Sequence, residues 1–267
     1  QIIPPSIALV LLGDVIAIAY QRAQLKMCVG NSATVSVGDL FVGALIPGLI
    51  LVGLYLVWIL LVARLKPQYA PAITSKGASI TKLVSALLPP FLLIALVLGS
   101  ILLGAATPTE AAGVGAVGAL LLALLRGQMD WLKLHDIGLS TMRITSMVFL
   151  ILIGAAVFTL VFRGFGGEEL VQGFFERMNL GPQGAMLLVM IVIFLLGFIL
   201  DFIEITFVVV PIVGPILLAM GFDPIWFGIM LAVNLQTSFL TPPFGFALFY
   251  LRGVAPKTVT TGSIYKG

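Results

Sequence analysis

Long apolar runs fill most of this sequence and limit its possible folds more than any other feature. A helix needs roughly 20 apolar residues to cross the hydrocarbon core of a bilayer, so the shorter runs are candidates for half-helices or re-entrant arms. The runs lie at residues 2–20, 38–63, 83–104, 108–125, 144–162, 184–200, 203–220, 224–239 and 244–256. The pattern therefore predicts an all-α polytopic membrane protein.

The composition supports this class and excludes two others. Only 9% of the 267 residues are charged, against roughly 25% in a typical soluble domain, and 60% are hydrophobic. Mean hydropathy is +1.20. So few charges cannot cover a water-soluble surface, and disorder requires low hydrophobicity with high charge. The lone Cys28 and lone His135 exclude a disulfide scaffold and give no support to a Cys- or His-based metal site.

The two ends of the chain resemble neither a signal peptide nor a finished terminus. Residues 1–5 lack an initiator Met, a basic region and a cleavage site, so we expect a fragment of a larger membrane protein. Residues 257–267 are expected to form a cytoplasmic connection to further chain.

The basic residues indicate how the runs are oriented. Loop 64–82 contains four Lys or Arg residues and no acid, and loop 126–143 is also basic, so both are predicted to be cytoplasmic. Segments 21–37 and 163–183 then face the periplasm. The four of the 14 basic residues left outside are Arg22, Lys26, Arg163 and Arg177. Because basic residues concentrate at segment ends, they indicate no nucleic-acid partner.

A capping box marks one helix start. Thr107 is a typical N-cap, Pro108 suits the first helical position and Glu110 can bond back to the cap. This role accounts for Glu110 without any chemistry.

Tandem prolines occur twice, in opposite halves of the chain. Pro242 and Pro243 remove two backbone donors and must interrupt a helix, and Pro4-Pro5-Ser6 also precedes an apolar half-helix. The first half-helix exits toward the outside and the second toward the inside. Two broken helices of opposite sense are typical of inverted-topology repeats in secondary transporters.

Asp201 and Glu204 are the only carboxylates deep within the apolar stretch 184–220. Their i,i+3 spacing places them on one helical face. A charge at membrane depth costs about 2.5–3.5 kcal/mol on insertion scales, so it usually faces a cavity, a partner or an ion. The alternative is an interfacial loop that joins two ordinary helices.

A polar run lies directly before the second proline pair. Its oxygens, with carbonyls freed by unwound backbone, suit a hard cation such as Na⁺. The alternative is a proline kink whose freed backbone groups bond to neighbouring Ser and Thr side chains. The run consists of Asn234, Gln236, Thr237, Ser238 and Thr241.

No known catalytic motif occurs in the sequence. It contains no Ser/His/Asp set, Walker loop or HExxH motif. An intramembrane enzyme that uses Asp201 and Glu204 is the alternative from another class. A scaffold or channel subunit would leave the mirrored prolines unexplained.

Six strings in order resemble the large membrane (M) subunit of tripartite ATP-independent periplasmic (TRAP) transporters. They are residues 2–6 (IIPPS), 38–48 (GDLFVGALIPG), 104–112 (GAATPTEAA), 211–215 (PIVGP), 221–228 (GFDPIWFG) and 240–245 (LTPPFG). The resemblance covers what would be the C-terminal two-thirds of such a subunit. A secondary transporter of another family is the remaining alternative.

The resemblance implies Na⁺-coupled, elevator-type uptake of an organic acid, such as a dicarboxylate, 2-oxo acid or sugar acid. The partners it implies are a small membrane (Q) subunit and a periplasmic solute-binding (P) protein, in the bacterial or archaeal cytoplasmic membrane. Na⁺ is then the coupling ion, and no other cofactor is expected. The chain would divide into 1–20 (end of the first repeat), 21–183 (mainly scaffold), 184–256 (second re-entrant hairpin and broken helix) and 257–267.

In that scheme the hairpin tip faces the helix break, and a second sodium site lies between them. The expected ligands are the side chains of Asp201, Asn234, Thr237 and Thr241 and the backbone of Gly197 and Leu240. The expected substrate-side residues are Pro4, Pro5, Ser6, Glu204, Pro242, Pro243 and Gly245.

Overall fold

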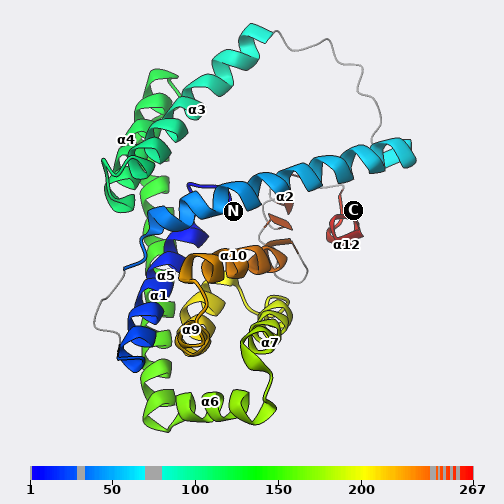
Figure 1. Cartoon of the computed structure of the whole chain (residues 1–267). Helices are drawn as coiled ribbons and strands as arrows, with labels where there is room; N and C mark the ends of the chain where they lie inside the picture. The colour runs from blue at the N-terminus through cyan, green and yellow to red at the C-terminus, as the bar shows by residue number, and fades with distance from the viewer. Residues whose placement is uncertain are drawn as a thin grey trace. The chain divides into compact units, whose positions relative to one another are not determined.

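The structure is a computed structural model that describes residues 2–28, 34–69, 80–240, 245, 247–248, 251–252, 255–256 and 259–266. All regular structure in these residues is helical (Figure 1). Six of the described helices are long and apolar enough to cross a membrane, or up to seven if a bent pair counts as one span. These findings confirm the predicted all-α polytopic membrane class.

The helices follow the apolar runs closely. They are α1 (Ile7–Lys26), α2 (Val37–Leu65), η1 (Pro67–Tyr69), α3 (Ile80–Leu102), α4 (Pro108–Leu125), α5 (Trp131–Gly164), α6 (Gly167–Met178), α7 (Gly181–Leu196), α8 (Phe202–Glu204), the π-helical turn η2 (Ile205–Val209), α9 (Val210–Ala219), α10 (Pro224–Leu240) and α12 (Thr261–Lys266).

The chain forms two compact units. The first comprises Gln1–Ile2, Ser6–Leu40 and Leu139–Gly267, and the second comprises Ile3–Pro5 and Phe41–Gly138. These boundaries differ from the four predicted segments, and the assignment of scaffold and transport parts stays a prediction.

Helix α1 is central to the first unit, where it packs against α9, η2 and α10 (Figure 1). Two glycines allow this close approach. A Cβ atom on Gly214 of α9 would lie 3.2 Å from Ala19 Cβ, and one on Gly228 of α10 would lie 2.7 Å from Ile16 Cδ1. Small residues are typical of tight helix packing in membranes, where burial from water does not drive helices together. Half of α1 is therefore buried.

In the second unit, the consecutive helices α3 and α4 contact each other. Helix α4 begins with the predicted capping box: Glu110 Oε2 accepts a hydrogen bond from Thr107 N at 2.8 Å, and Thr107 Oγ1 accepts one from Glu110 N at 3.4 Å. Only 6% of the most apolar stretch of α2, and likewise of α4, is buried within the structure. This is expected of helices whose remaining surface faces lipid.

The stretch 184–220 forms two arms around a break. The chain leaves α7, loses regular structure over 197–201, and continues through α8 and η2 into α9, which contacts α7. The segment Phe202–Ala219 is 56% buried within the structure, far more than α2 or α5. The predicted re-entrant hairpin over this stretch, and its opening toward the periplasm, stay predictions.

Two charged segments contain helical structure that the apolar runs did not predict. The segment 126–143 is helical from Trp131, because Asp130 Oδ1 accepts a hydrogen bond from Lys133 N at 2.8 Å and starts α5. The segment 163–183 contains α6, which has acidic Glu168 and Glu169 in its first turn and basic Arg177 in its last. The prediction of a loop at 126–143 was wrong, because charge was given more weight there than helix-start chemistry.

Candidate functional site

Asp201 and Glu204 begin a helix inside the first unit. Asp201 is the N-cap of α8, where its Oδ1 accepts a hydrogen bond from Phe202 N at 2.6 Å. Glu204 Oε2 accepts one from Asp201 N at 3.2 Å, which completes a capping box. Both residues are half-buried. A carboxylate offers about four acceptor positions, so capping leaves room for a further ligand on these groups.

The turn that carries the two carboxylates packs against the end of α10. The rings of Phe202 and Phe239 have centroids 4.8 Å apart, which places α8 beside the last turn before residue 241. Five residues before Phe239 on α10, Asn234 Nδ2 donates a hydrogen bond to Met190 O of α7 at 2.8 Å. The end of α10 is therefore tied to both the α7 arm and the tip of the two-armed element.

The remaining predicted ligands are described only in part. Gly197 is the C-cap of α7, and its N–H donates to Ile193 O at 2.9 Å. Leu240 is the last residue of α10, and Gly245 O accepts a hydrogen bond from Leu248 N at 2.8 Å. The Thr237 side chain and the residues Thr241, Pro242 and Pro243 lie outside the described residues.

The first proline pair precedes α1, which has 20 residues and is long enough to cross a membrane, whereas the sequence analysis expected a half-helix there. Pro4 and Pro5 are joined by a cis peptide bond. Ser6 follows as the N-cap of α1, where its buried Oγ accepts a hydrogen bond from Leu9 N at 3.3 Å. The structure thus gives Ser6 a capping role, and its predicted contact with a solute stays a prediction.

Thr206 is a buried polar residue that the sequence analysis missed. It lies in η2, directly after the capping box, and no part of it is exposed. Its Oγ1 has no hydrogen-bond partner among the described residues. π-Helical turns inside α-helices are rare and occur frequently at functional sites. A hydroxyl within the run ITFVV was the only signal in the sequence, and it resembled ordinary packing.

Comparison with known proteins decides the family. A family model described as "Tripartite ATP-independent periplasmic transporter, DctM component" matches residues 1–267. The chain belongs to this family. The resemblance to a TRAP large membrane subunit is thereby confirmed.

Named relatives of this TRAP chain differ in their solutes. It is 32% identical over 235 residues to a C4-dicarboxylate TRAP large permease of Pseudomonas aeruginosa, an alignment of 86% of this chain and 54% of that protein. It is 30% identical over 177 residues to a sialic acid TRAP large permease of Vibrio cholerae, covering 62% and 40%. A 2,3-diketo-L-gulonate permease of Escherichia coli is 27% identical over 161 residues, covering 60% and 38%.

The TRAP chain spans about half the length, or less, of these curated relatives. All of them are named as transporter permeases, which supports a transport role over an intramembrane enzyme. The family and the apolar helices also support a membrane location.

The oxygen groups around α8 are the candidate ligands for Na⁺, the ion that the resemblance implies. Within the described residues, no cluster of three or more His, Cys, Asp or Glu could hold a metal ion. The groups around α8 are instead two carboxylates and the orphaned Thr206 hydroxyl. Oxygen donors of this kind suit a hard cation such as Na⁺ better than a transition metal. Sodium and its ligand set both stay predictions.

Proposed function

We propose that the complete protein takes up an organic acid together with Na⁺. The solute is delivered by a periplasmic solute-binding protein, and a small membrane subunit completes the complex in the cytoplasmic membrane. Movement is by elevator-type alternating access, in which the two-armed element α7–α9 travels with the broken helix that begins at α10.

One observation carries this proposal furthest: the tip with Asp201 and Glu204 packs on the end of α10 through Phe202 and Phe239. A cation needs several oxygens from a compact cage, and helix breaks at the midplane of secondary transporters free carbonyls for that purpose. We expect such carbonyls from the break between α7 and α8 and from the proline pair that follows α10.

The proposal gives each site residue a role. Asp201 holds Na⁺ with Asn234, Thr237 and Thr241 and with backbone oxygens near Gly197 and Leu240. The positive ion offsets the cost of a carboxylate at membrane depth. On the solute side are Pro4, Pro5, Ser6, Glu204, Pro242, Pro243 and Gly245.

The organic-acid solute is supported by the relatives. Three of these relatives are named for a C4-dicarboxylate, sialic acid and 2,3-diketo-L-gulonate, which all carry a carboxyl group. We expect a carboxylate on the solute of this protein as well.

The test is uptake into proteoliposomes that contain the complete complex and its binding protein. Radiolabelled succinate, sialic acid and 2,3-diketo-L-gulonate are offered with an inward Na⁺ gradient, and a K⁺ gradient of equal size serves as the control. We expect at least one of these acids to accumulate with Na⁺ and none with K⁺. Equal accumulation under both gradients would exclude sodium coupling.

A further inference from the structure

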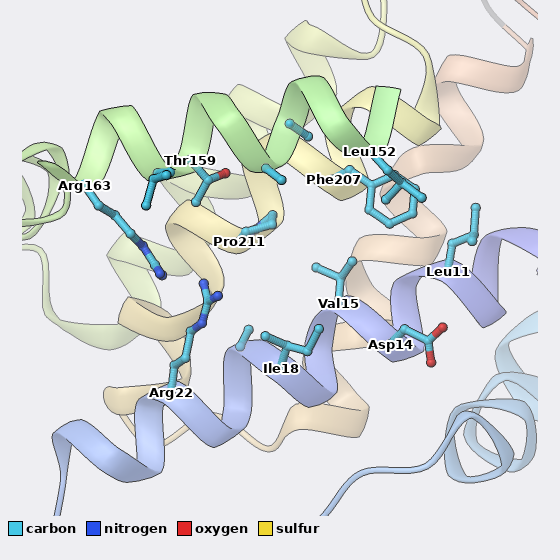
Figure 2. A pocket seen from close by; sticks show the side chains of 14 residues that line it. Leu11, Asp14, Val15, Ile18, Arg22, Leu152, Thr159, Arg163, Phe207 and Pro211 are labelled. Carbon is cyan, nitrogen blue, oxygen red and sulfur yellow. The ribbon is translucent and has the colours of Figure 1, made fainter. Parts of the chain in front are cut away.

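A cavity of about 520 Å³ lies in the first unit between α1, α5 and the η2–α9 segment (Figure 2). Its walls are mainly aliphatic. The volume falls within the range of about 300–1,000 Å³ that is typical of ligand sites. None of the residues assigned to sodium or solute above lines it.

Charge is distributed unevenly along this cavity. Arg22 of α1 and Arg163 of α5 extend toward one another at one end, and Asp14 lies toward the other end (Figure 2). Asp14 and Arg22 are eight positions apart on α1, which corresponds to about 12 Å along the helix axis. An anion at the arginines is thus kept away from the Asp14 carboxylate.

The two arginines differ in their partners. Arg163 Nε lies 2.5 Å from Glu168 Oε1, and the same carboxyl group accepts a hydrogen bond from Lys26 Nζ at 3.2 Å. Arg22 has no ion pair or hydrogen bond among the described residues, although it also lines the adjoining hollow with Glu168 and Glu169.

The charges at this end leave one positive charge in excess. Arg22, Lys26 and Arg163 contribute three positive charges, and Glu168 and Glu169 contribute two negative charges. Two guanidinium groups that face each other repel, and an anion between them removes that cost. Guanidinium is also the side-chain group best suited to phosphate, because its planar donors match phosphate oxygens in pairs.

The position of the cavity on the helices points to a membrane component. Arg22 lies in the last turns of α1 and Arg163 in the last turn of α5, where basic side chains reach the bilayer interface. The aliphatic walls extend from that end toward the middle of both helices, along Leu11, Leu152 and Leu160. A ligand that fills this space has an anionic head and an apolar tail.

We propose that this cavity binds an anionic phospholipid, with its phosphate between Arg22 and Arg163 and an acyl chain along α1 and α5. The Thr159 hydroxyl, which lines the same wall, supplies a further donor near the headgroup (Figure 2). Because the lipid contacts α1, α5 and α9 together, it stabilises the first unit and is distinct from the transported solute.

The test compares the melting temperature of the full complex in neutral detergent with and without added lipid. Phosphatidylglycerol is expected to raise the Tm by about 3 °C, while phosphatidylcholine of equal chain length has little effect. Glycerol 3-phosphate and succinate serve as separate arms for a free anion and a solute-type acid, and neither is expected to reproduce the shift.

The variants Arg22→Gln and Arg22→Lys are compared with Arg177→Gln, a control on α6 that does not line the cavity. Arg22→Gln should abolish the phosphatidylglycerol shift, Arg22→Lys should keep part of it, and Arg177→Gln should keep all of it. Native mass spectrometry should find fewer co-purified anionic lipids on Arg22→Gln. An equal shift in all variants, or an equal shift with glycerol 3-phosphate, would overturn the proposal.

Discussion

Glu168 joins helices that lie far apart in the sequence. It is 142 residues from Lys26, and it pairs with both Lys26 of α1 and Arg163 of α5. Burial raises the pKa of the Glu168 carboxyl, but the hydrogen bond from Lys26 and the charge of Arg163 outweigh this effect, so its pKa lies below the usual value of 4.5. The charged form is therefore stabilised by the fold.

The sign of the resulting pH dependence follows from the lowered pKa. The stabilising contribution of Glu168 is fully present above its unfolded-state pKa and is lost as the pH falls through its lower folded-state pKa. Glu168→Gln should therefore cost about 1 kcal/mol near pH 7 and progressively less below about pH 4. Thermal unfolding of the detergent-solubilised protein from pH 3 to 8 measures the difference.

The matched control for this prediction is Glu169→Gln. Glu169 is the neighbouring carboxyl on α6 and forms no ion pair in the described part of the chain. Its substitution should change the Tm little at any pH. If both variants lose the same stability at pH 7, the network around Glu168 contributes nothing of its own.

At the scale of single elements, the contact between α8 and α10 holds the tip against the helix end. It rests on the rings of Phe202 and Phe239, both of which are buried. Aromatic pairs contribute about 0.5–1.5 kcal/mol beyond the area they bury. Phe239→Leu keeps an apolar side chain and removes the ring contact.

Phe239→Leu should lower the stability by about 1 kcal/mol and raise the Na⁺ concentration needed for half-maximal uptake. The control is Phe222→Leu, which removes a ring from the stacked pair with Trp226 at the opposite end of α10. It should leave the sodium dependence unchanged. A Phe239→Leu protein with wild-type sodium dependence would show that the tip does not depend on this contact.

Local motifs were the part of the fold that the sequence could predict. The apolar runs and the Thr107–Glu110 capping box depend on residues close in sequence, and the structure confirms both. The same box at Asp201–Glu204 was missed because the apolar context suggested an ion or partner site or an interfacial loop, and not a helix start. The π-helical turn at Thr206 and the ion pairs of Glu168 depend on packing between distant helices, which no local pattern encodes.

For the whole molecule, the central proposal is that a sodium ion binds at the tip carried by α8. Asp201→Asn removes the charge while keeping a good N-cap, since Asn caps helices about as well as Asp. The matched control is Asp223→Asn. The Asp223 carboxyl group accepts a hydrogen bond from Trp226 N at 2.8 Å at the start of α10. Any difference between these variants therefore reports the charge at the tip and not the loss of a capping acid.

The most direct measurement is the Na⁺ concentration for half-maximal uptake by the reconstituted complex. For Asp201→Asn we expect it to rise roughly tenfold, which corresponds to about 1.4 kcal/mol of ion binding, with Thr241→Val shifting it in the same direction. Asp223→Asn should match the wild type. Unchanged sodium dependence in both Asp201→Asn and Thr241→Val, with the complex intact, would place the ion elsewhere and contradict the account.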